Sequence, residues 1–461
     1  MRPRAVVAFL LAAAAGATSY RSVRASEEQQ LVANRHAQAR VLAPFAHRDG
    51  EVIVAFVDGT SDADMERSLR AGGAREARRS RFGARVLAKI EPGADVAQAA
   101  ARFSRQPGVA YAEANGLVAM DQGATFHPND SLYRFQWNLT QVGAERTWGI
   151  QKGKSSVAVA VLDTGVAYED YGDPNTGQQF RKAPDWGGTR FLPGYDFFNG
   201  DEHANDDEGH GTHVASTIAE ATNNDAGMAG LAFDCAIMPI KVLGPEGVGS
   251  FFDVADGIDY AIGFTENGQR PVKVINLSLS SPSFSQTAKA AIDRAVAAGV
   301  LVVAAAGNTG GSVRFPADQT NVVGVGALNA VKELAVYSNR GAELDLVAPG
   351  GDCESDDDHD GTPDCVFQQT LRFTAVTQGR YDDFCYCGLE GTSMATPHVA
   401  AAAALLYSQG FTDVASVRAA LEKTAERLGD APPGGRNNSF GNGLIRPAAA
   451  LPGYGLNVSA H

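Results

Sequence analysis

The sequence predicts an α/β fold in which a parallel sheet lies between layers of helices, preceded by a small α+β unit. Apolar runs rich in β-branched residues recur from residue 157 onward, and helical segments separate them. Continuous apolar strands that alternate with helices are typical of a parallel sheet covered on both faces. The expected strands are 157–162, 236–242, 272–277, 299–304 and 322–325, and the expected helices lie near 210–221, 251–263, 285–298 and 393–408.

The small α+β unit precedes this pattern, and a polar stretch at 121–123 separates the two. Its elements are predicted from runs of apolar residues with strand or helix periodicity. The expected strands are 52–57, 84–90 and 109–114, and the expected helices are 62–71 and 94–105. No side chain in this unit indicates chemistry, so the sequence predicts a structural role for it.

The first 25 residues have the features of a secretory signal. Arg2 and Arg4 supply a positive start, residues 6–15 an apolar centre and residues 15–17 a small-residue exit, with a second exit after Ala25. The apolar run is shorter than the ~20 residues that a spanning helix needs, so we do not expect a membrane anchor. The net charge of −14 argues against a nucleic-acid binder, because phosphate binding needs clustered Lys and Arg.

The five cysteines suit an exported protein, in which disulfides can form. Four of them lie close together in the sequence and allow three pairings. We favour a bridge between Cys353 and Cys365, because these two bracket one acidic loop. Cys385 and Cys387 are expected to be too close in sequence to bridge each other easily. Cys235 lies in an apolar run and is predicted to be a buried thiol.

Polar residues that can carry chemistry follow the predicted strands or begin the predicted helices. Asp163 and Asn308 each come shortly after an apolar strand. His210 opens a helix in the stretch His-Gly-Thr-His, and Ser393 opens another in Gly-Thr-Ser-Met-Ala-Thr-Pro-His. In open α/β sheets, ligands bind outside the carboxyl ends of the strands. The sequence therefore predicts that these four side chains meet at one edge of the sheet.

Each of these residues also has a plain structural interpretation. Asp163 can form a turn, and Ser393 can be a helix N-cap. His210 and His213 can bind a metal from one helical face, but no glutamate lies between them and no third ligand is evident. We therefore expect His213 and His398 to be ordinary helix residues.

A catalytic triad of aspartate, histidine and serine occurs on several unrelated folds, and the order of the three residues along the chain differs among them. Here the order is Asp–His–Ser, which is the order of the subtilisin fold. The sequence resembles the subtilases from about residue 130 to 450, and residues 50–118 resemble the propeptide of that family, a chaperone and inhibitor. The matching stretches are Val-Ala-Val-Leu-Asp163-Thr-Gly, His210-Gly-Thr-His-Val-Ala, Val-Ile-Asn276-Leu-Ser-Leu, Ala-Ala-Gly-Asn308, Val-Ala-Pro-Gly350 and Gly-Thr-Ser393-Met-Ala-Thr-Pro-His-Val-Ala.

The resemblance implies a subtilisin-type three-layer fold, a ferredoxin-like propeptide and a site that hydrolyses peptide bonds. Ser393 is then the nucleophile and His210 the general base, while Asp163 orients the imidazole. Asn308 and the backbone N–H of Ser393 hold the developing oxyanion. No catalytic cofactor is implied.

The resemblance also places the substrate groove. One edge falls at Ser278, Leu279 and Ser280, where an extended peptide pairs as an added strand. The pocket for the substrate side chain lies between that edge and a second wall at Ala304–Gly307. Within this wall, the residues expected to bind substrate are Ala305, Ala306 and Gly307. These walls carry no charge, so we expect an apolar or aromatic residue before the cut. Ser280 stands where the family usually has glycine, and its side chain narrows this pocket.

Two calcium sites are predicted. The stretch from Thr222 to Met228 resembles the family's calcium loop, and a plain turn is the alternative interpretation. Its ligands would be the side chains of Asn224 and Asp130 and the carbonyl oxygens of Thr222, Ala226 and Met228. The second candidate is an acidic insertion at 352–366, where alternate carboxylates suit a hard cation and a solvated acidic loop is the alternative. Its candidate ligands are Asp356, Asp358, Asp360 and Asp364.

The domain organisation that follows is a signal peptide at 1–25, a propeptide at 26–121 and a catalytic domain at 122–461. We expect a secreted monomer that acts on proteins or peptides, is inhibited by its own propeptide, and cuts itself near residues 119–127. The alternative is a catalytically silent binding protein with the same fold.

Overall fold

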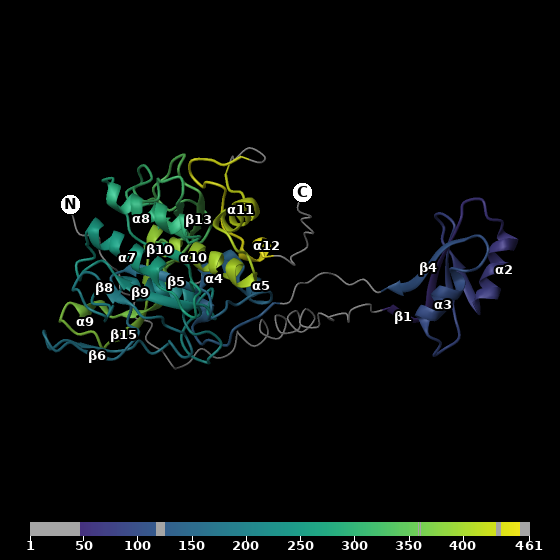
Figure 1. Ribbon diagram of the computed structural model, residues 1–461, viewed down its shortest axis with the longest axis horizontal. Coiled ribbons are helices and arrows are strands. Elements are labelled where there is room, and N and C mark those ends of the chain that lie inside the picture. The colour runs from purple at the N-terminus through teal and green to yellow at the C-terminus, as the bar shows by residue number, and fades with distance from the viewer. Residues whose placement is uncertain (1–46, 117–124, 358, 360, 430–434, 452–461) are drawn as a thin grey trace. The chain divides into compact units, whose positions relative to one another are not determined.

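The structure, a computed structural model, describes residues 47–116, 125–357, 359, 361–429 and 435–451. The predicted signal peptide and the candidate ligands Asp358 and Asp360 lie outside the described residues. The chain divides into two compact units, one within Gly16–Gln122 and the other within Gly123–His461 (Figure 1).

The smaller unit is α+β, as predicted, and consists of an antiparallel sheet and two helices. Its strand order is β2-β3-β1-β4, and its core contains Val52, Val54 and Phe103. The charged strand β2 has no apolar alternation, and the sequence did not reveal it. The elements are β1 (His47–Phe56), α2 (Asp62–Gly72), β2 (Glu76–Arg79), β3 (Arg85–Lys89), α3 (Val96–Phe103) and β4 (Val109–Gly116).

The larger unit is built on a parallel sheet of seven strands in the order β13-β12-β11-β10-β5-β9-β8. The predicted apolar strands all belong to it, and five of the seven strands are buried along their whole length, as expected for a sheet covered on both faces. The strands are β5 (Ala158–Asp163), β8 (Tyr195–Asp196), β9 (Ala236–Lys241), β10 (Val272–Leu277), β11 (Leu301–Ala305), β12 (Val323–Leu328) and β13 (Leu346–Pro349).

Helices cover both faces of this sheet (Figure 1). Helices α7 (Phe251–Gly263) and α8 (Gln286–Ala297) pack on each other and on one face, whereas α6 (His210–Ala219) and α10 (Thr392–Gln409) pack on the other. This confirms the three-layer fold. Apart from one hairpin described below, the remaining elements of this unit are η1 (Tyr133–Phe135), α4 (Trp137–Val142), α5 (Ala144–Trp148), β6 (Tyr171–Gly172), β7 (Gln179–Phe180), α9 (Phe373–Val376), α11 (Val414–Thr424) and α12 (Pro447–Ala450).

A separate hairpin of β14 (Val366–Leu371) and β15 (Phe384–Leu389) packs on α6. The sequence analysis did not predict it, because β14 contains Gln368 and Gln369, which are polar yet buried. Strand β15 ends three residues before α10 begins, so the hairpin leads the chain directly to Ser393.

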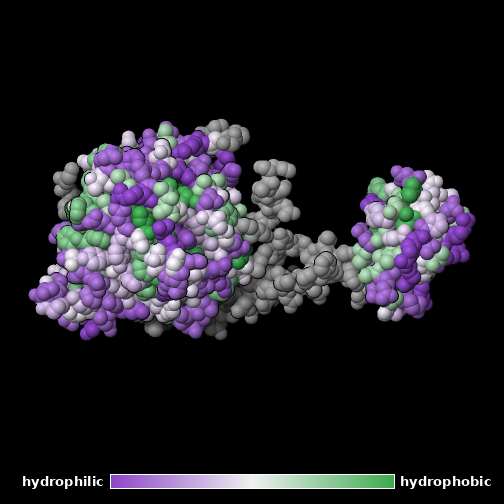
Figure 2. Space-filling model, in the orientation of Figure 1, coloured by the Kyte–Doolittle hydropathy of each residue, from purple (hydrophilic) through white to green (hydrophobic). Residues whose placement is uncertain are grey.

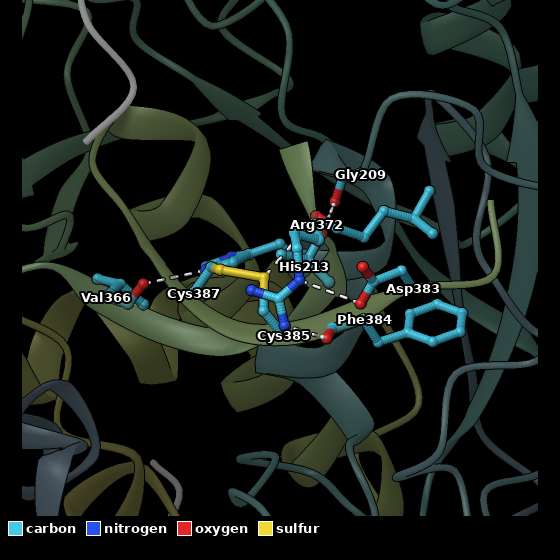
Figure 3. The surroundings of a disulfide bond; sticks show 10 residues. Gly209, His213, Val366, Arg372, Asp383, Phe384, Cys385 and Cys387 are labelled. Atoms are coloured by element: carbon cyan, nitrogen blue, oxygen red, sulfur yellow. Dashed lines mark hydrogen bonds and ion pairs between the residues drawn. A yellow bond between two sulfur atoms is a disulfide. The ribbon is translucent and has the colours of Figure 1, made fainter. Parts of the chain in front are cut away.

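The cysteine predictions are confirmed except for one. Cys353 and Cys365 form the expected disulfide, and Cys235 is a buried free thiol. The expectation that Cys385 and Cys387 do not bridge each other is wrong: they form a disulfide beside α6 (Figure 3). The two residues are alternate positions of β15, so their side chains share one face of the strand, and a Cα–Cα distance of 5.4 Å lies within the range that a disulfide spans.

The surface of the larger unit is mixed in character. In the face shown in Figure 2, hydrophilic residues dominate and small apolar areas lie between them. In the part of the chain that the structure describes, no helix is both long and apolar enough to cross a membrane.

Candidate active site

Three neighbouring strands bring the predicted site residues to one edge of the sheet. Strands β5, β10 and β11 are adjacent and parallel, so their carboxyl ends lie side by side. Asp163 is the last residue of β5, Ser278 follows β10 directly, and Asn308 follows β11 after a turn. The topology thereby gathers residues that are far apart in the sequence, as the rule for open α/β sheets requires.

His210 is the first residue of α6, and its imidazole faces Asp163. The Nδ1–H of His210 donates to Asp163 Oδ1 at 2.6 Å, and the same oxygen accepts from Thr164 N at 2.8 Å. The Asp163 side chain is fully buried, whereas 24 % of the His210 side chain is exposed. A Cβ at Gly211 would lie 2.1 Å from Gly165 O, so glycine is needed here for the helix to approach the end of β5.

Ser393 is the second residue of α10 and faces the same cavity as His210. Its hydroxyl donates to Ser278 O at 3.0 Å, and the hydroxyl of Ser278 donates to Ser393 O at 2.8 Å. No acceptor for the backbone N–H of Ser393 is present among the described residues, as is usual in the first turn of a helix. In this conformation the serine proton points to Ser278, so its hydroxyl must turn before it can bond to His210.

Asn308 is oriented by the residue that precedes the serine. Both the backbone N and the Oγ1 of Thr392 donate to Asn308 Oδ1, each at 2.8 Å. The amide nitrogen Nδ2 consequently lies on the other side, close to Gly391. A Cβ at Gly391 would lie 3.2 Å from Asn308 Nδ2 and 3.6 Å from Ser393 N, so these two donors lie close to each other.

A cavity of about 470 Å³ extends from these residues. Ser278, Leu279 and Ser280, the predicted groove edge, line it together with His210 and Ser393. Seven apolar side chains also line it: Leu243, Val248, Phe251, Val254, Ala288, Ile292 and Phe315.

The second predicted wall, formed by Ala305, Ala306 and Gly307, is buried and is not part of this cavity's lining. It nevertheless faces the groove edge, because a Cβ at Gly307 would lie 3.3 Å from Ser280 Oγ. The space between the two predicted walls is therefore narrow at Ser280.

The other two histidines of the candidate motifs are structural, as predicted. His213 Nε2 bonds to Val366 O at 3.0 Å, and His398 bonds through Nδ1 to Met394 O and through Nε2 to Asn138. Burial lowers the pKa of His213 to about 3 and that of His398 to about 4, so both are neutral. Among the described residues, no third side chain joins His210 and His213 in a group that could hold a metal ion.

The electrostatics of the site favour the protonated imidazole. Burial lowers the pKa of His210, but the carboxylate of Asp163, with smaller contributions from Glu208 and Asp206, outweighs it and raises the pKa to about 9. Sequence analysis missed Glu208, which lies two residues before His210, accepts its backbone N–H at 2.8 Å and lines the cavity. The signal that could have identified Glu208 from the sequence is its position next to the histidine in a run of acidic residues.

We expect Glu208→Gln to shift the acid limb of the activity profile to lower pH. A general base must be neutral, so kcat/KM rises as pH passes through the pKa of His210. Removing the negative charge of Glu208 lowers that pKa, by about half to one unit for a charge at this range. A pH profile of kcat/KM measures the shift, and Glu202→Gln, an exposed site in the same loop, is the matched control. An unchanged limb in Glu208→Gln would contradict this account of the pKa.

The first predicted calcium loop gathers two carboxylates. Asp130 Oδ2 accepts from Asn223 N at 2.7 Å, while its Oδ1 is buried and has no hydrogen-bond partner among the described residues. Asn224 Nδ2 donates to Asp185 Oδ1 at 2.6 Å. Asp185 is a ligand candidate that sequence analysis missed, since it lies in a loop without periodicity.

Two further observations suit a cation at this loop. Burial raises the pKa of both Asp130 and Asp185, and no Lys or Arg is among the groups that shift either pKa. A Cβ at Gly227 would lie 1.8 Å from Asp185 Oδ2, so glycine is needed for the loop to approach that carboxylate. Thr222, Ala226 and Met228 belong to the same loop.

The acidic insertion is arranged differently. Asp364 is buried, and its Oδ2 accepts from Asp357 N at 2.7 Å. Asp356 Oδ2 accepts from Gly361 N at 3.2 Å. Both carboxylates therefore bond to the backbone of their own loop. Within the described ranges, no three or more His, Cys, Asp and Glu side chains are grouped so that they could hold a metal ion.

Comparison with known proteins decides the family. The model of the subtilase family, Peptidase S8, matches residues 154–443. The chain belongs to the subtilase family. The model of the fervidolysin N-terminal prodomain matches residues 34–115, so this subtilase carries a prodomain in front of its peptidase unit.

Individual relatives agree. The subtilase is 35 % identical over 390 residues to a thermophilic serine proteinase of Bacillus sp. strain AK1, covering 83 % of this chain and 84 % of the relative. It is 37 % identical over 317 residues to subtilisin Savinase of Lederbergia lenta, covering 68 % and 97 %. A solved protease structure from Pseudoalteromonas arctica matches with a TM-score of 0.59 and 31 % identity, covering 70 % of this chain and 98 % of that one. The subtilase is a serine-type endopeptidase.

Proposed function

We propose that this subtilase is a secreted, calcium-stabilised endopeptidase that hydrolyses peptide bonds with Asp163, His210 and Ser393. The observation that carries the proposal is the 2.6 Å hydrogen bond between His210 Nδ1 and Asp163 Oδ1 at a cavity that Ser393 also lines. Only Nε2 of His210 is then left to accept a proton, and it is the nitrogen on the side away from Asp163.

Acylation begins when the Ser393 hydroxyl turns from Ser278 O towards His210. Its Oγ attacks the carbonyl carbon of the substrate while Nε2 of His210 takes the proton. Asp163 keeps the imidazole in the tautomer with a proton on Nδ1 and stabilises the imidazolium that forms. Because Asp163 is buried, this interaction is weakly screened.

The negative charge that develops on the carbonyl oxygen is held by Asn308 Nδ2 and Ser393 N. Thr392 fixes the amide of Asn308 beforehand, so these donors need not reorganise during the reaction. His210 then returns its proton to the leaving amine, and the C–N bond breaks. Water repeats the sequence on the acyl-enzyme, with His210 as base, and releases the carboxylic acid and the serine.

The substrate lies in the groove along Ser278–Ser280. The apolar lining of the cavity, with Phe251, Leu243 and Phe315, suits an apolar side chain of a residue upstream of the cut. Binding here is remote from the reacting bond, so it contributes to orientation of the substrate.

The proposed maturation of the precursor is supported by the division of the chain into two units and by the match to a prodomain. We place a signal peptide at 1–25, a propeptide at 26–121 that acts as inhibitor and chaperone, and the catalytic domain at 122–461. The mature enzyme would act outside the cell as a monomer, with proteins or peptides as substrates and no nucleic-acid or membrane partner.

Calcium is proposed to stabilise the fold rather than to take part in catalysis. Asp130, Asp185 and Asn224 with the carbonyl oxygens of Thr222, Ala226 and Met228 would hold the ion at the first loop. Such a hard cation supplies positive charge to buried carboxylates. The second site, with Asp356 and Asp364, would require these carboxylates to turn outward from their loop.

Chelation of calcium is expected to lower the unfolding temperature of the mature enzyme. A ligand at one hundred times its Kd stabilises a fold by about 3 kcal/mol, which corresponds to roughly 4 °C for a catalytic unit of this length, because the entropy of unfolding grows with chain length. Calorimetry of enzyme inactivated at its serine, with and without EGTA, measures the difference without self-digestion. Asp185→Asn should reduce the difference, and Glu333→Gln, an exposed carboxylate, should not. An equal effect of EGTA in both variants would count against this site.

A serine-directed phosphonate tests the proposed mechanism against its alternatives. It should label Ser393 and abolish activity in parallel. A catalytically silent binding protein would show no activity to abolish. A metallohydrolase built on His210 and His213 would stay active after treatment and lose activity to a zinc-specific chelator, which would overturn the proposal.

A further inference from the structure

Arg314 lies beside the space in which the residue before the cut would place its side chain. Its backbone N donates to Ala306 O at 3.0 Å, and a Cβ at Gly307 would lie 3.2 Å from Arg314 Cδ. The same Cβ position lies 3.3 Å from Ser280 Oγ. The stem of Arg314 is therefore packed where the two predicted pocket walls approach each other.

The chain around Arg314 also contacts the groove edge. Ser281 N donates to Phe315 O at 2.8 Å, so the segment of Arg314 bridges the wall at Ala306 and the edge at Ser281. Sequence analysis considered only the walls themselves, which carry no charge. The segment that contains Arg314 places a positive charge beside these uncharged walls.

The charge of Arg314 has no counterpart among the residues that the structure describes. Arg314 is half-buried, and across the described residues no hydrogen bond, ion pair or ring contact involves its guanidinium. Every other half-buried arginine of the described larger unit has such a partner; these are Arg190, Arg270, Arg372, Arg418 and Arg446.

The absence of a partner is unexpected for this protein. The chain has 53 Asp and Glu against 39 Lys and Arg, so acidic side chains are plentiful. A partly desolvated cation without a hydrogen-bonded partner is unfavourable. A carboxylate that enters with the substrate would satisfy it, because guanidinium binds carboxylate in a bidentate geometry.

The position of Asn308 shows which substrate residue is concerned. Asn308 is proposed to bind the oxygen of the carbonyl under attack, and that carbonyl belongs to the residue before the cut. Gly307 precedes Asn308 directly, so the side chain of that same residue enters the space beside Gly307 and Ser280. We propose that Arg314 selects substrates with an acidic side chain at the residue before the cut, which rests on the function proposed above.

This inference changes the expectation of an apolar residue at that position. The apolar lining of the cavity then serves a substrate residue further upstream, while Arg314 serves the residue at the cut. The competing interpretation is that the arginine stem merely fills the space and its head group is hydrated. That interpretation predicts a preference for small residues with no dependence on charge.

Peptide anilides that differ only in the residue before the cut test the proposal. With wild-type enzyme at pH 9, we expect Glu to exceed the neutral isostere Gln in kcat/KM by about 10- to 100-fold, the range for a hydrogen bond to a charged group. Arg314→Gln should bring the Glu/Gln ratio close to one, and Arg314→Glu should favour Lys over Gln. Arg340→Gln, an exposed arginine in the same unit, is the matched control and should retain the wild-type ratio.

Equal cleavage of the Glu and Gln peptides by the wild-type enzyme would overturn the inference, and this measurement needs no variant to fold. An unchanged ratio in Arg314→Gln would overturn it as well. Failure of the proposed function appears differently: no peptide would be cut, casein would stay intact and the phosphonate would not label Ser393.

Discussion

Replacing Ser393 with alanine is expected to lower kcat by about a million-fold, as expected for loss of a triad serine. Ser278, whose hydroxyl is bonded to Ser393, cannot take its place, because Ser278 Oγ donates to Ser393 O and accepts from Asn276 and is therefore committed to structure. The donors of the oxyanion remain in the variant, and a residual rate above that of water should persist.

The same variant should remain an uncut precursor. We expect the enzyme to cut itself within residues 119–127, whose acidic residue is Asp121. The preference inferred for Arg314 then places the cut between Asp121 and Gln122, and N-terminal sequencing of the mature wild-type chain measures it. Ser283→Ala, at an exposed serine near the groove edge, should mature normally. If pure Ser393→Ala protein matures unaided, self-processing is wrong.

Asp163→Asn is expected to lower kcat by about 10⁴-fold at neutral pH. The 2.6 Å contact to His210 Nδ1 can persist, but an amide can donate to that nitrogen and thereby favour the tautomer with its proton on Nε2. The imidazole then cannot take the serine proton. Substrate contacts are unaffected, so KM should change little.

The variant can be matured by a trace of an unrelated protease, which is then removed. Steady-state kinetics of the matured variant test this expectation. The pH profile adds a second readout, because loss of the Asp163 charge should also lower the pKa of His210 from about 9. Glu333→Gln, which removes an exposed carboxylate, is the control. A variant that keeps wild-type kcat would show that Asp163 does not orient the base.

The fold and the proposed triad were accessible from the sequence because they depend on local signals. The strands that carry Asp163 and Asn308 are apolar throughout, and the parallel topology then brings their ends together. Hydrophobic periodicity also predicted α6 and α10, which begin at or next to His210 and Ser393.

Other features depend on tertiary packing and left no such signal. Strand β14 was missed because Gln368 and Gln369 are polar yet buried: the strand packs on α6, and these residues bond to Ala229 and Glu220. Asp185 becomes a ligand candidate only when its loop meets Asn224. Arg314 lies in a loop, and only the fold shows that its stem faces Gly307.

The disulfide between Cys385 and Cys387 shows a limit of sequence spacing as a criterion. Spacing alone suggested that the bridge would not form, whereas the conformation of β15 places both side chains on one face of the strand. Strand conformation, which was not predicted for this segment, was the missing information.

The structure of the enzyme after reaction with a peptidyl phosphonate tests the central claim most directly. We expect a covalent bond from Ser393 Oγ to phosphorus, His210 Nε2 within hydrogen-bond distance of the adduct, and a phosphonyl oxygen bound by Asn308 Nδ2 and Ser393 N. A Ser393 hydroxyl that still donates to Ser278 O, with the phosphorus bonded to another side chain, would contradict the proposed mechanism.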